Sequence, residues 1–240
     1  MANQLPYDAS MMPTELQSNI SEVDRRIRAA ELASGRASGA VSLLAVSKTK
    51  PSELIRQAHG FGLLAFGENY AQEMAEKAAA LADLPLSWHF IGPIQSNKTA
   101  LIAEVSDWVH SIDRLKVARR LSEQRPDGKA PLNVLVQINT SNEDSKSGVR
   151  PNAAPELMAA ISELPGLRLR GLMTIPAATT NQTEQREPFR QLRALMNQLS
   201  DSLPQLDTLS MGMSGDLEAA VSEGANIVRV GTDIFGARYN

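Results

Sequence analysis

The chain has 240 residues, of which 42% are hydrophobic and 21% charged, a composition that is typical of a folded globular protein and excludes disorder as its main state. Its 24 basic and 27 acidic residues give a formal net charge of −3, so no excess of positive charge favours nucleic acid as a partner. The absence of cysteine excludes disulfides, thiolate nucleophiles and cysteine-ligated metals, and it points to the cytoplasm.

The N-terminal region carries no targeting pattern. Its first twenty residues lack the basic start and apolar segment of a secretory signal, and no apolar run of the chain approaches the roughly 18 residues of a membrane span. We therefore expect neither a leader nor a membrane partner. Residues 1–12 are expected to be irregular, whereas 13–36 carry apolar residues at helical spacing among many charges, which predicts a surface helix.

From residue 40 onward, short apolar runs alternate with stretches of helical composition, the pattern of βα units in a parallel sheet. Eight strands are predicted, at 41–47, 63–67, 86–91, 108–112, 133–139, 167–173, 207–211 and 226–231. A helix is predicted after each of the first seven strands, at 51–59, 72–82, 97–105, 114–124, 155–164, 184–203 and 215–223. Eight such units favour a (β/α)8 barrel over an open doubly wound sheet, and the lack of a linker predicts one domain over 1–240.

The first candidate for chemistry is Lys48, which ends the first predicted strand on the same face as Leu44 and Val46. That face should point into the barrel, where active groups gather at the strand ends. A lysine above an apolar interior has a lowered pKa and can act as a Schiff-base nucleophile, although a lone strand-end lysine more often only extends its amine to water. Lys50 precedes Pro51 and is expected in an extended loop, so Lys48 is the better candidate.

Two glycine-containing loops follow the seventh and eighth predicted strands, where barrels usually bind phosphate. The first is Ser210-Met-Gly-Met-Ser-Gly-Asp216, in which Ser214 can cap a helix whose free N–H groups suit an anion. In the second, Gly231 and Thr232 come directly after the strand. A phosphate site and an ordinary pair of caps or turns are both compatible with these loops.

Arg229 alternates with Val228 and Val230 in the eighth predicted strand and is expected to point inward, beside these loops. A buried cation needs an anion or an acceptor. A bound phosphate would meet this need, and so would a salt bridge with Glu68 or Asp233.

Metal binding and serine hydrolysis find no support in the sequence. His59, His89 and His110 lack metal-ligand spacing, so two of them are expected to be hydrogen-bonded core residues, while His89 stands out near a strand end. The Ser-x-x-Lys spacing at 47–50 matches penicillin-binding acyl enzymes, but there the serine opens a helix and here it ends a strand. The Gly-x-Ser-x-Gly motif does not occur.

The stretch Trp88-His-Phe-Ile-Gly-Pro-Ile-Gln-Ser-Asn-Lys98 resembles the signature of the YggS-like pyridoxal phosphate homeostasis protein family. Further matches follow in the family's order over about residues 15–238: Ala45-Val-Ser-Lys-Thr-Lys50, Gly67-Glu-Asn-Tyr70, 139–148, Gly171-Leu-Met173, 210–216 and Arg229-Val-Gly-Thr232. The resemblance implies a modified TIM barrel of PLP fold type III, similar to the barrel domain of alanine racemase, with an extra N-terminal helix. Such a barrel holds pyridoxal 5′-phosphate (PLP) as an internal aldimine.

The same resemblance implies the roles of individual residues. Lys48 would carry PLP, and Arg229 would face its pyridine nitrogen. The phosphate would be bound by Ser214, Gly231 and Thr232, and the pocket would be lined by Asn69, His89 and Met173. No residue is implied to be catalytic.

An arginine cannot give a proton to the pyridine nitrogen, so the ring stabilises a carbanion less than it does beside an aspartate. This setting favours a non-catalytic protein that holds and passes on PLP, with PLP-dependent apoenzymes or PLP-supplying enzymes as expected partners and a monomer as the expected state. The alternative is an amino-acid racemase, which needs a second base. In alanine racemase a tyrosine, presented with help from a second domain, serves as that base; here only Tyr7, Tyr70 and Tyr239 are available, and the chain ends four residues after Gly236. A Schiff-base aldolase on the same barrel is a more distant alternative.

Overall fold

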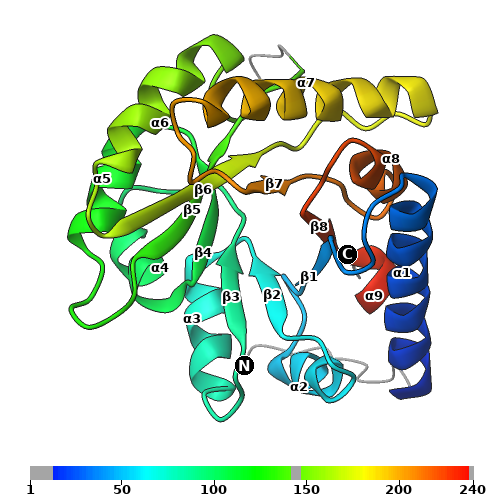
Figure 1. The fold of residues 1–240 in the computed structure, drawn as a ribbon. Coiled ribbons are helices and arrows are strands. Elements are labelled where there is room, and N and C mark those ends of the chain that lie inside the picture. Colours follow the sequence, from blue (N-terminus) through cyan, green and yellow to red (C-terminus); the bar gives the residue numbers. More distant parts are fainter. Residues whose placement is uncertain (1–12, 142–146, 238–240) are drawn as a thin grey trace.

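The computed structural model describes residues 13–141 and 147–237, so the segment 1–12, expected to be irregular, lies outside the described residues. Eight parallel strands pair in sequential order, and the last pairs with the first to close a barrel (Figure 1). The strands are β1 (Ser42–Val46), β2 (Ala65–Glu68), β3 (Ser87–Phe90), β4 (Trp108–Ile112), β5 (Leu132–Gln137), β6 (Leu167–Met173), β7 (Thr208–Ser210) and β8 (Ile227–Val230). The predicted (β/α)8 barrel is therefore confirmed.

Helices surround the strands (Figure 1). They are α1 (Pro13–Ala33), α2 (Ser52–Gly60), α3 (Ala71–Ala80), α4 (Thr99–Val105), α5 (Leu115–Glu123), α6 (Ala154–Ser162), α7 (Gln182–Ser200), α8 (Leu217–Ser222) and α9 (Thr232–Phe235), with a 3₁₀ turn, η1 (Pro151–Ala153), before α6. Neither α9 nor η1 was expected from the sequence. Within the described ranges, no helix combines the length and the apolar character that a membrane span requires.

The two faces of the strands have different neighbours. Phe66 and Phe90 point outward and join a hydrophobic core with helix residues such as Ile55 and Met74. Side chains on the other face meet inside the barrel: His110 of β4 hydrogen-bonds to Ser210 of β7, although these strands are not neighbours. The alternation of side chains along each strand thus separates an apolar outer core from a partly polar interior.

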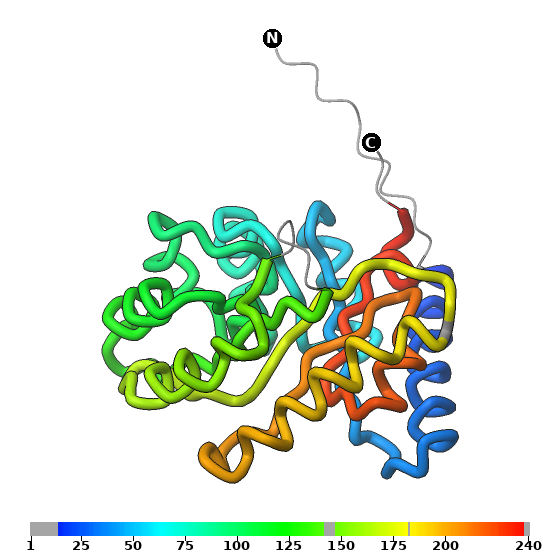
Figure 2. Tube along the Cα trace, turned by 90° about the horizontal axis from the view of Figure 1, so that it is seen from above, coloured from blue at the N-terminus to red at the C-terminus, as the bar shows by residue number. Residues whose placement is uncertain are grey.

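Helix α1 packs beside α8 and α9, on the side where the barrel closes (Figure 1 and Figure 2). Its buried stripe consists of Leu16, Ile20, Val23 and Ile27.

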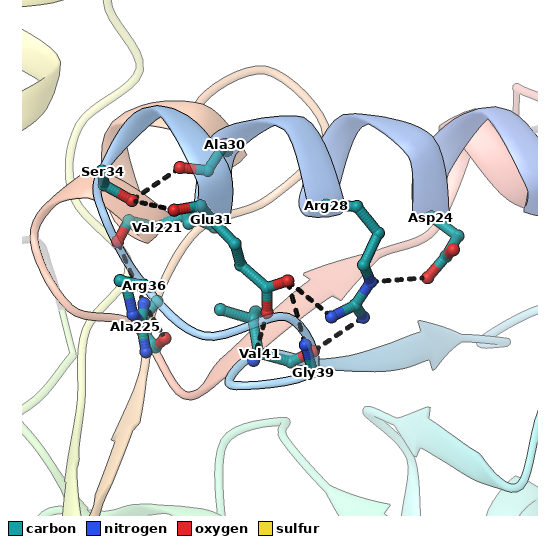
Figure 3. A network of polar contacts seen from close by, with 10 residues as sticks. All are labelled: Asp24, Arg28, Ala30, Glu31, Ser34, Arg36, Gly39, Val41, Val221 and Ala225. Atoms are coloured by element: carbon teal, nitrogen blue, oxygen red, sulfur yellow. Dashed lines mark hydrogen bonds and ion pairs between the residues drawn. The ribbon is translucent and has the colours of Figure 1, made fainter.

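The turn that leads from α1 to β1 is held by the buried carboxylate of Glu31, as shown in Figure 3. This group accepts hydrogen bonds from the backbone N–H of Gly39 and Val41 at 3.1 and 2.7 Å, and from Arg28 at 2.7 Å. In the same turn, Arg36 donates to the carbonyl oxygens of Val221 and Ala225, which ties the α1–β1 connection to α8 and to the loop between α8 and β8.

Candidate functional site

Lys48 lies two residues after the end of β1, at the end of the barrel where the strands terminate, and it is half-buried. The residue that follows, Thr49, has φ +64°, a left-handed conformation that is unusual for a β-branched side chain. On its other side, the Ser47 hydroxyl donates a hydrogen bond to Glu68 Oε1 at 2.7 Å. The backbone on both sides of Lys48 is therefore fixed by neighbouring elements.

A buried charge cluster provides this support. The Lys77 ammonium of α3 donates to the Ser47 carbonyl at 2.8 Å, to Glu68 Oε1 at 2.7 Å and to Glu73 Oε1 at 2.6 Å. The Glu73 carboxylate also accepts the backbone N–H of Thr49 at 2.6 Å. Glu68 is fully buried, and burial raises the pKa of its carboxyl even though Lys77 and the Ser47 hydroxyl act against the shift. This cluster was not expected from the sequence, where its only signal is the i, i+4 spacing of Glu73 and Lys77 on one helix face.

The loops after β7 and β8 approach the end of β1. Gly231 lies so close to it that an added Cβ would be 3.1 Å from the Val46 carbonyl oxygen. The backbone N–H groups of Ser214, Gly231 and Thr232 donate to no other residue in the part of the chain that the structure describes. The two loops thus present free donors of the kind that bind phosphate.

Arg26 of α1 holds these loops from outside. Its guanidinium donates to the Ser214 carbonyl at 2.9 Å, to Asp233 at 2.6 Å and to Glu218 at 2.7 Å. One side chain therefore connects the loop after β7, the start of α8 and the residue after Thr232. Nothing in the sequence distinguishes Arg26 from the other charged residues of its helix.

Arg229 of β8 lies inside the barrel with 3% of its surface exposed. Its guanidinium donates to the Ser210 hydroxyl and to the Thr174 carbonyl, both at 2.8 Å. Burial lowers the pKa of Arg229 to about 10, and Asp216 acts in the opposite direction. Neither carboxylate that the sequence suggested as a salt-bridge partner contacts it.

Glu68 is instead paired with Lys77, and Asp233 with Arg26. Among the described residues, Arg229 forms no ion pair. A buried cation without a carboxylate partner is suited to an anionic or electron-rich ligand.

Two buried histidines, His110 and His89, are connected to Arg229 through the hydroxyl of Ser210. His110 Nδ1 lies 2.9 Å from Ser210 Oγ, and its Nε2 lies 2.9 Å from His89 Nδ1. His89 Nε2 in turn lies 3.2 Å from Ser87 Oγ. Burial lowers the pKa of His89 to about 3 and that of His110 well below its ordinary value, so both rings are neutral. The expectation of two core histidines fits His110, whereas His59 is only half-buried on α2.

Asn69 and Met173, the other two residues expected to line a pocket, both lie at strand ends. Met173 is fully buried at the end of β6, and Asn69 follows β2. The Asn69 Oδ1 atom is buried and has no hydrogen-bond partner among the described residues, so its capacity to accept a hydrogen bond is unused. Gly92 approaches the same residue closely, because an added Cβ would lie 2.1 Å from the Asn69 carbonyl oxygen.

Comparisons with known proteins agree with this architecture. Residues 18–239 match the family model described as alanine racemase, N-terminal domain. The solved alanine racemase of Corynebacterium glutamicum has the same fold, with a TM-score of 0.68 at 17% identity over 94% of this chain and 62% of that one. The closed barrel, with a lysine after its first strand and free donors after its last two, thus defines a protein of the alanine racemase N-terminal domain class.

Similar curated proteins show which family within this class the chain belongs to. The chain is 59% identical to the pyridoxal phosphate homeostasis protein of Pseudomonas aeruginosa, over 93% of this chain and 96% of the relative. It is 50% identical to the protein of the same name from Escherichia coli K12, over 93% and 97%. The structure of PipY from Synechococcus elongatus with PLP bound is similar, with a TM-score of 0.80 and 34% identity over 92% of this chain and all of that chain. The chain belongs to the pyridoxal phosphate homeostasis protein family.

Proposed function

We propose that this protein binds PLP at the carboxyl end of its barrel and holds it covalently on the amine of Lys48, as a carrier that maintains the supply of the cofactor. The observation that carries the proposal is Arg229, a buried guanidinium that forms no ion pair in the described part of the chain and donates only to neutral oxygens. Arg229 pairs in register with Leu44, four residues before Lys48, so the strand of Arg229 is adjacent to the strand that leads to Lys48. PLP has an aldehyde for the lysine, a ring nitrogen for the arginine and a phosphate for free N–H groups.

The residues present fit such a ligand. The loops containing Ser214, Gly231 and Thr232 offer unpaired backbone donors for the phosphate. The buried Asn69 amide, whose Oδ1 lacks a partner, and Met173 would border the ring, and His89 would support it from the barrel interior. When bound, PLP would supply an electrophilic aldehyde with which amino groups condense, next to a ring that withdraws electrons. The relatives named above, one of them solved with PLP bound, support the same assignment.

The absence of catalysis in this proposal follows from the chemistry of the arginine. A guanidinium donates hydrogen bonds but does not give up a proton, so the ring nitrogen beside it stays neutral and stabilises a carbanion poorly. Of the three tyrosines that could act as a racemase base, Tyr7 and Tyr239 lie outside the described residues. Tyr70 is 60% exposed and lines a cavity of about 300 Å³ beside Asn69.

Absorbance before and after borohydride, followed by peptide mapping, tests the covalent site. We expect a visible band in the purified protein that borohydride abolishes, with the pyridoxyl group found on the peptide that contains Lys48. Because Lys50 lies two residues away, digestion and fragmentation must separate the two lysines. A protein that stays colourless after addition of PLP would refute the proposal.

The racemase alternative makes a different prediction. It requires deuterium from solvent to enter the α-position of an L-amino acid, whereas we expect no exchange over a broad panel of amino acids. Transfer of the bound cofactor to PLP-dependent apoenzymes would support the carrier role, and size-exclusion chromatography would test the expected monomer. These partners, the monomeric state and the cytoplasmic location stay predictions.

A further inference from the structure

A continuous chain of hydrogen-bonding groups crosses the interior of the barrel. It runs from Arg229 on β8 to Ser210 on β7, then to His110 on β4, and ends on β3 at His89 and Ser87. Ser210, His110, His89 and Arg229 are all buried, and Ser87 is half-buried at the start of its strand. The chain therefore connects the candidate cofactor site with the opposite end of the barrel.

The donors and acceptors allow only one direction along this chain. Arg229 has donors and no acceptor, so the Ser210 oxygen must accept its hydrogen bond. The hydroxyl proton of Ser210 then has one acceptor within reach among the described residues, His110 Nδ1 at 2.9 Å. In the opposite direction this proton would be buried without a partner, an arrangement that folded proteins avoid.

The direction at Ser210 fixes the state of both imidazoles. His110 accepts at Nδ1, so its single proton is on Nε2 and is donated to His89 Nδ1. His89 then carries its proton on Nε2 and donates it to Ser87. A second proton on either ring would place two N–H groups against each other, or an N–H against the Ser210 hydroxyl proton. Both rings are therefore neutral and protonated at Nε2.

We propose that Ser210, His110 and His89 are positioning residues for Arg229: their one-directional hydrogen-bond chain keeps the Ser210 oxygen turned toward the guanidinium and so holds it against the ligand. With Ser210 and Thr174 each accepting from one terminal nitrogen, the remaining N–H bonds of Arg229 are left for the cofactor ring. The positioning role rests on the proposed function, because PLP is the ligand that Arg229 would contact. The direction of the hydrogen bonds rests only on the geometry.

The first test uses the unmodified protein, labelled with ¹⁵N at histidine, with and without PLP. Long-range ¹H–¹⁵N correlation spectra distinguish protonated from unprotonated ring nitrogens. We expect both His89 and His110 to be neutral and protonated at Nε2. A proton on Nδ1 of either ring would overturn the direction of the chain, whether or not the protein binds PLP.

The second test compares variants by the release of PLP and by the position of its visible band. Ser210→Ala removes one hydrogen bond to a charged group, so we expect release to become about tenfold faster and the band to shift. Ser210→Thr retains the hydroxyl and should restore both values. Ser106→Ala is the matched control, because Ser106 is a buried serine that donates to Met74 outside the barrel interior.

The outcomes separate the two proposals. If the unmodified protein binds no PLP, the proposed function fails. If it binds PLP but Ser210→Ala leaves the release rate and the band unchanged, the positioning role fails and the proposed function stands. A purely structural role of Ser210 would lower the unfolding temperature without moving the band, and that result also counts against positioning. Should Ser210→Ala not fold, His110→Gln serves in its place, with the histidine spectra deciding the direction.

Discussion

The Lys77 ammonium lies 2.8 Å from the carbonyl oxygen of Ser47, the residue immediately before Lys48. The same ammonium is paired with the buried carboxylate of Glu68 at 2.7 Å. Lys77 of α3 thus fixes the peptide bond between Ser47 and Lys48, the candidate cofactor lysine. Removing one partner of a buried ion pair leaves the other charge buried alone, so the stability of this region depends on both.

Lys77→Met should therefore destabilise the protein strongly. We expect the free energy of unfolding, measured in urea, to fall by about 3–5 kcal/mol, because Glu68 loses its counter-charge in a buried position. Arg56→Met is the matched control, since Arg56 and Asp83 form an exposed pair, and its cost should stay below about 1 kcal/mol. If both variants lost the same free energy of unfolding, the buried cluster would contribute no more to stability than the exposed pair.

Thr49 stores strain next to Lys48. Its φ of +64° is costly for a β-branched residue, whereas asparagine tolerates the left-handed region. Thr49→Asn should raise the free energy of unfolding by about 1 kcal/mol. Thr183→Asn, an exposed position near the start of α7, changes the same side chain at a helical φ and should give no gain. A loss of stability at position 49 would argue against strain there.

Gly92 allows the loop after β3 to pass Asn69 in close contact. A Cβ at this position would lie 2.1 Å from the Asn69 carbonyl oxygen, so Gly92→Ala must displace one of the two loops. We expect a loss of about 1–3 kcal/mol in stability, as for overpacked cores, and faster release of PLP. Gly60→Ala is the control, because an added Cβ there has no neighbour within 4 Å. The prediction fails if both variants behave like the unmodified protein.

The stability of the barrel should decrease in mild acid. Burial lowers the pKa of His89 to about 3 and that of His110 well below 6.5, so below pH 6.5 the unfolded chain binds more protons than the folded one. The stabilisation is complete above pH 6.5 and is lost as the pH falls toward 3. Each ring contributes a slope of up to about 1.4 kcal/mol per pH unit.

Urea unfolding at pH 7, 6 and 5 measures this slope. In His110→Gln the free energy of unfolding should change less steeply with pH between 6.5 and 5. The difference is the contribution of one histidine, because glutamine does not titrate. The variant retains an amide that can donate toward His89, so loss of packing is kept small. An unchanged slope would mean that His110 is not buried in its neutral form.

The fold was accessible from sequence because each strand is a short apolar run bounded by polar residues. All eight predicted strands are present with ends within two residues of the prediction, and β4 and β6 have the predicted bounds. Helix α9 was not predicted, because the four residues Thr232–Phe235 are too few to show a helical period. They follow Gly231 directly and are indistinguishable by composition from a loop.

The candidate site was accessible only where alternation along a strand decides the direction of a side chain. That rule places Arg229 inside the barrel, where the structure has it. Its partners could not be predicted, because Ser210 and Thr174 are 19 and 55 residues away and polar residues at strand ends are common. The contact of His110 with Ser210 spans 100 residues and depends on barrel closure, which no local pattern encodes.

Arg26 joins the first helix to loops that come 188 and 207 residues later, at Ser214 and Asp233. During synthesis these loops leave the ribosome last, so a growing chain contains Lys48 long before the loops proposed to bind the phosphate of PLP. On the proposed function, a growing chain therefore lacks the contacts that would retain the phosphate of the cofactor. A fragment released early lacks these contacts too, so we expect tight retention of PLP only in the finished molecule.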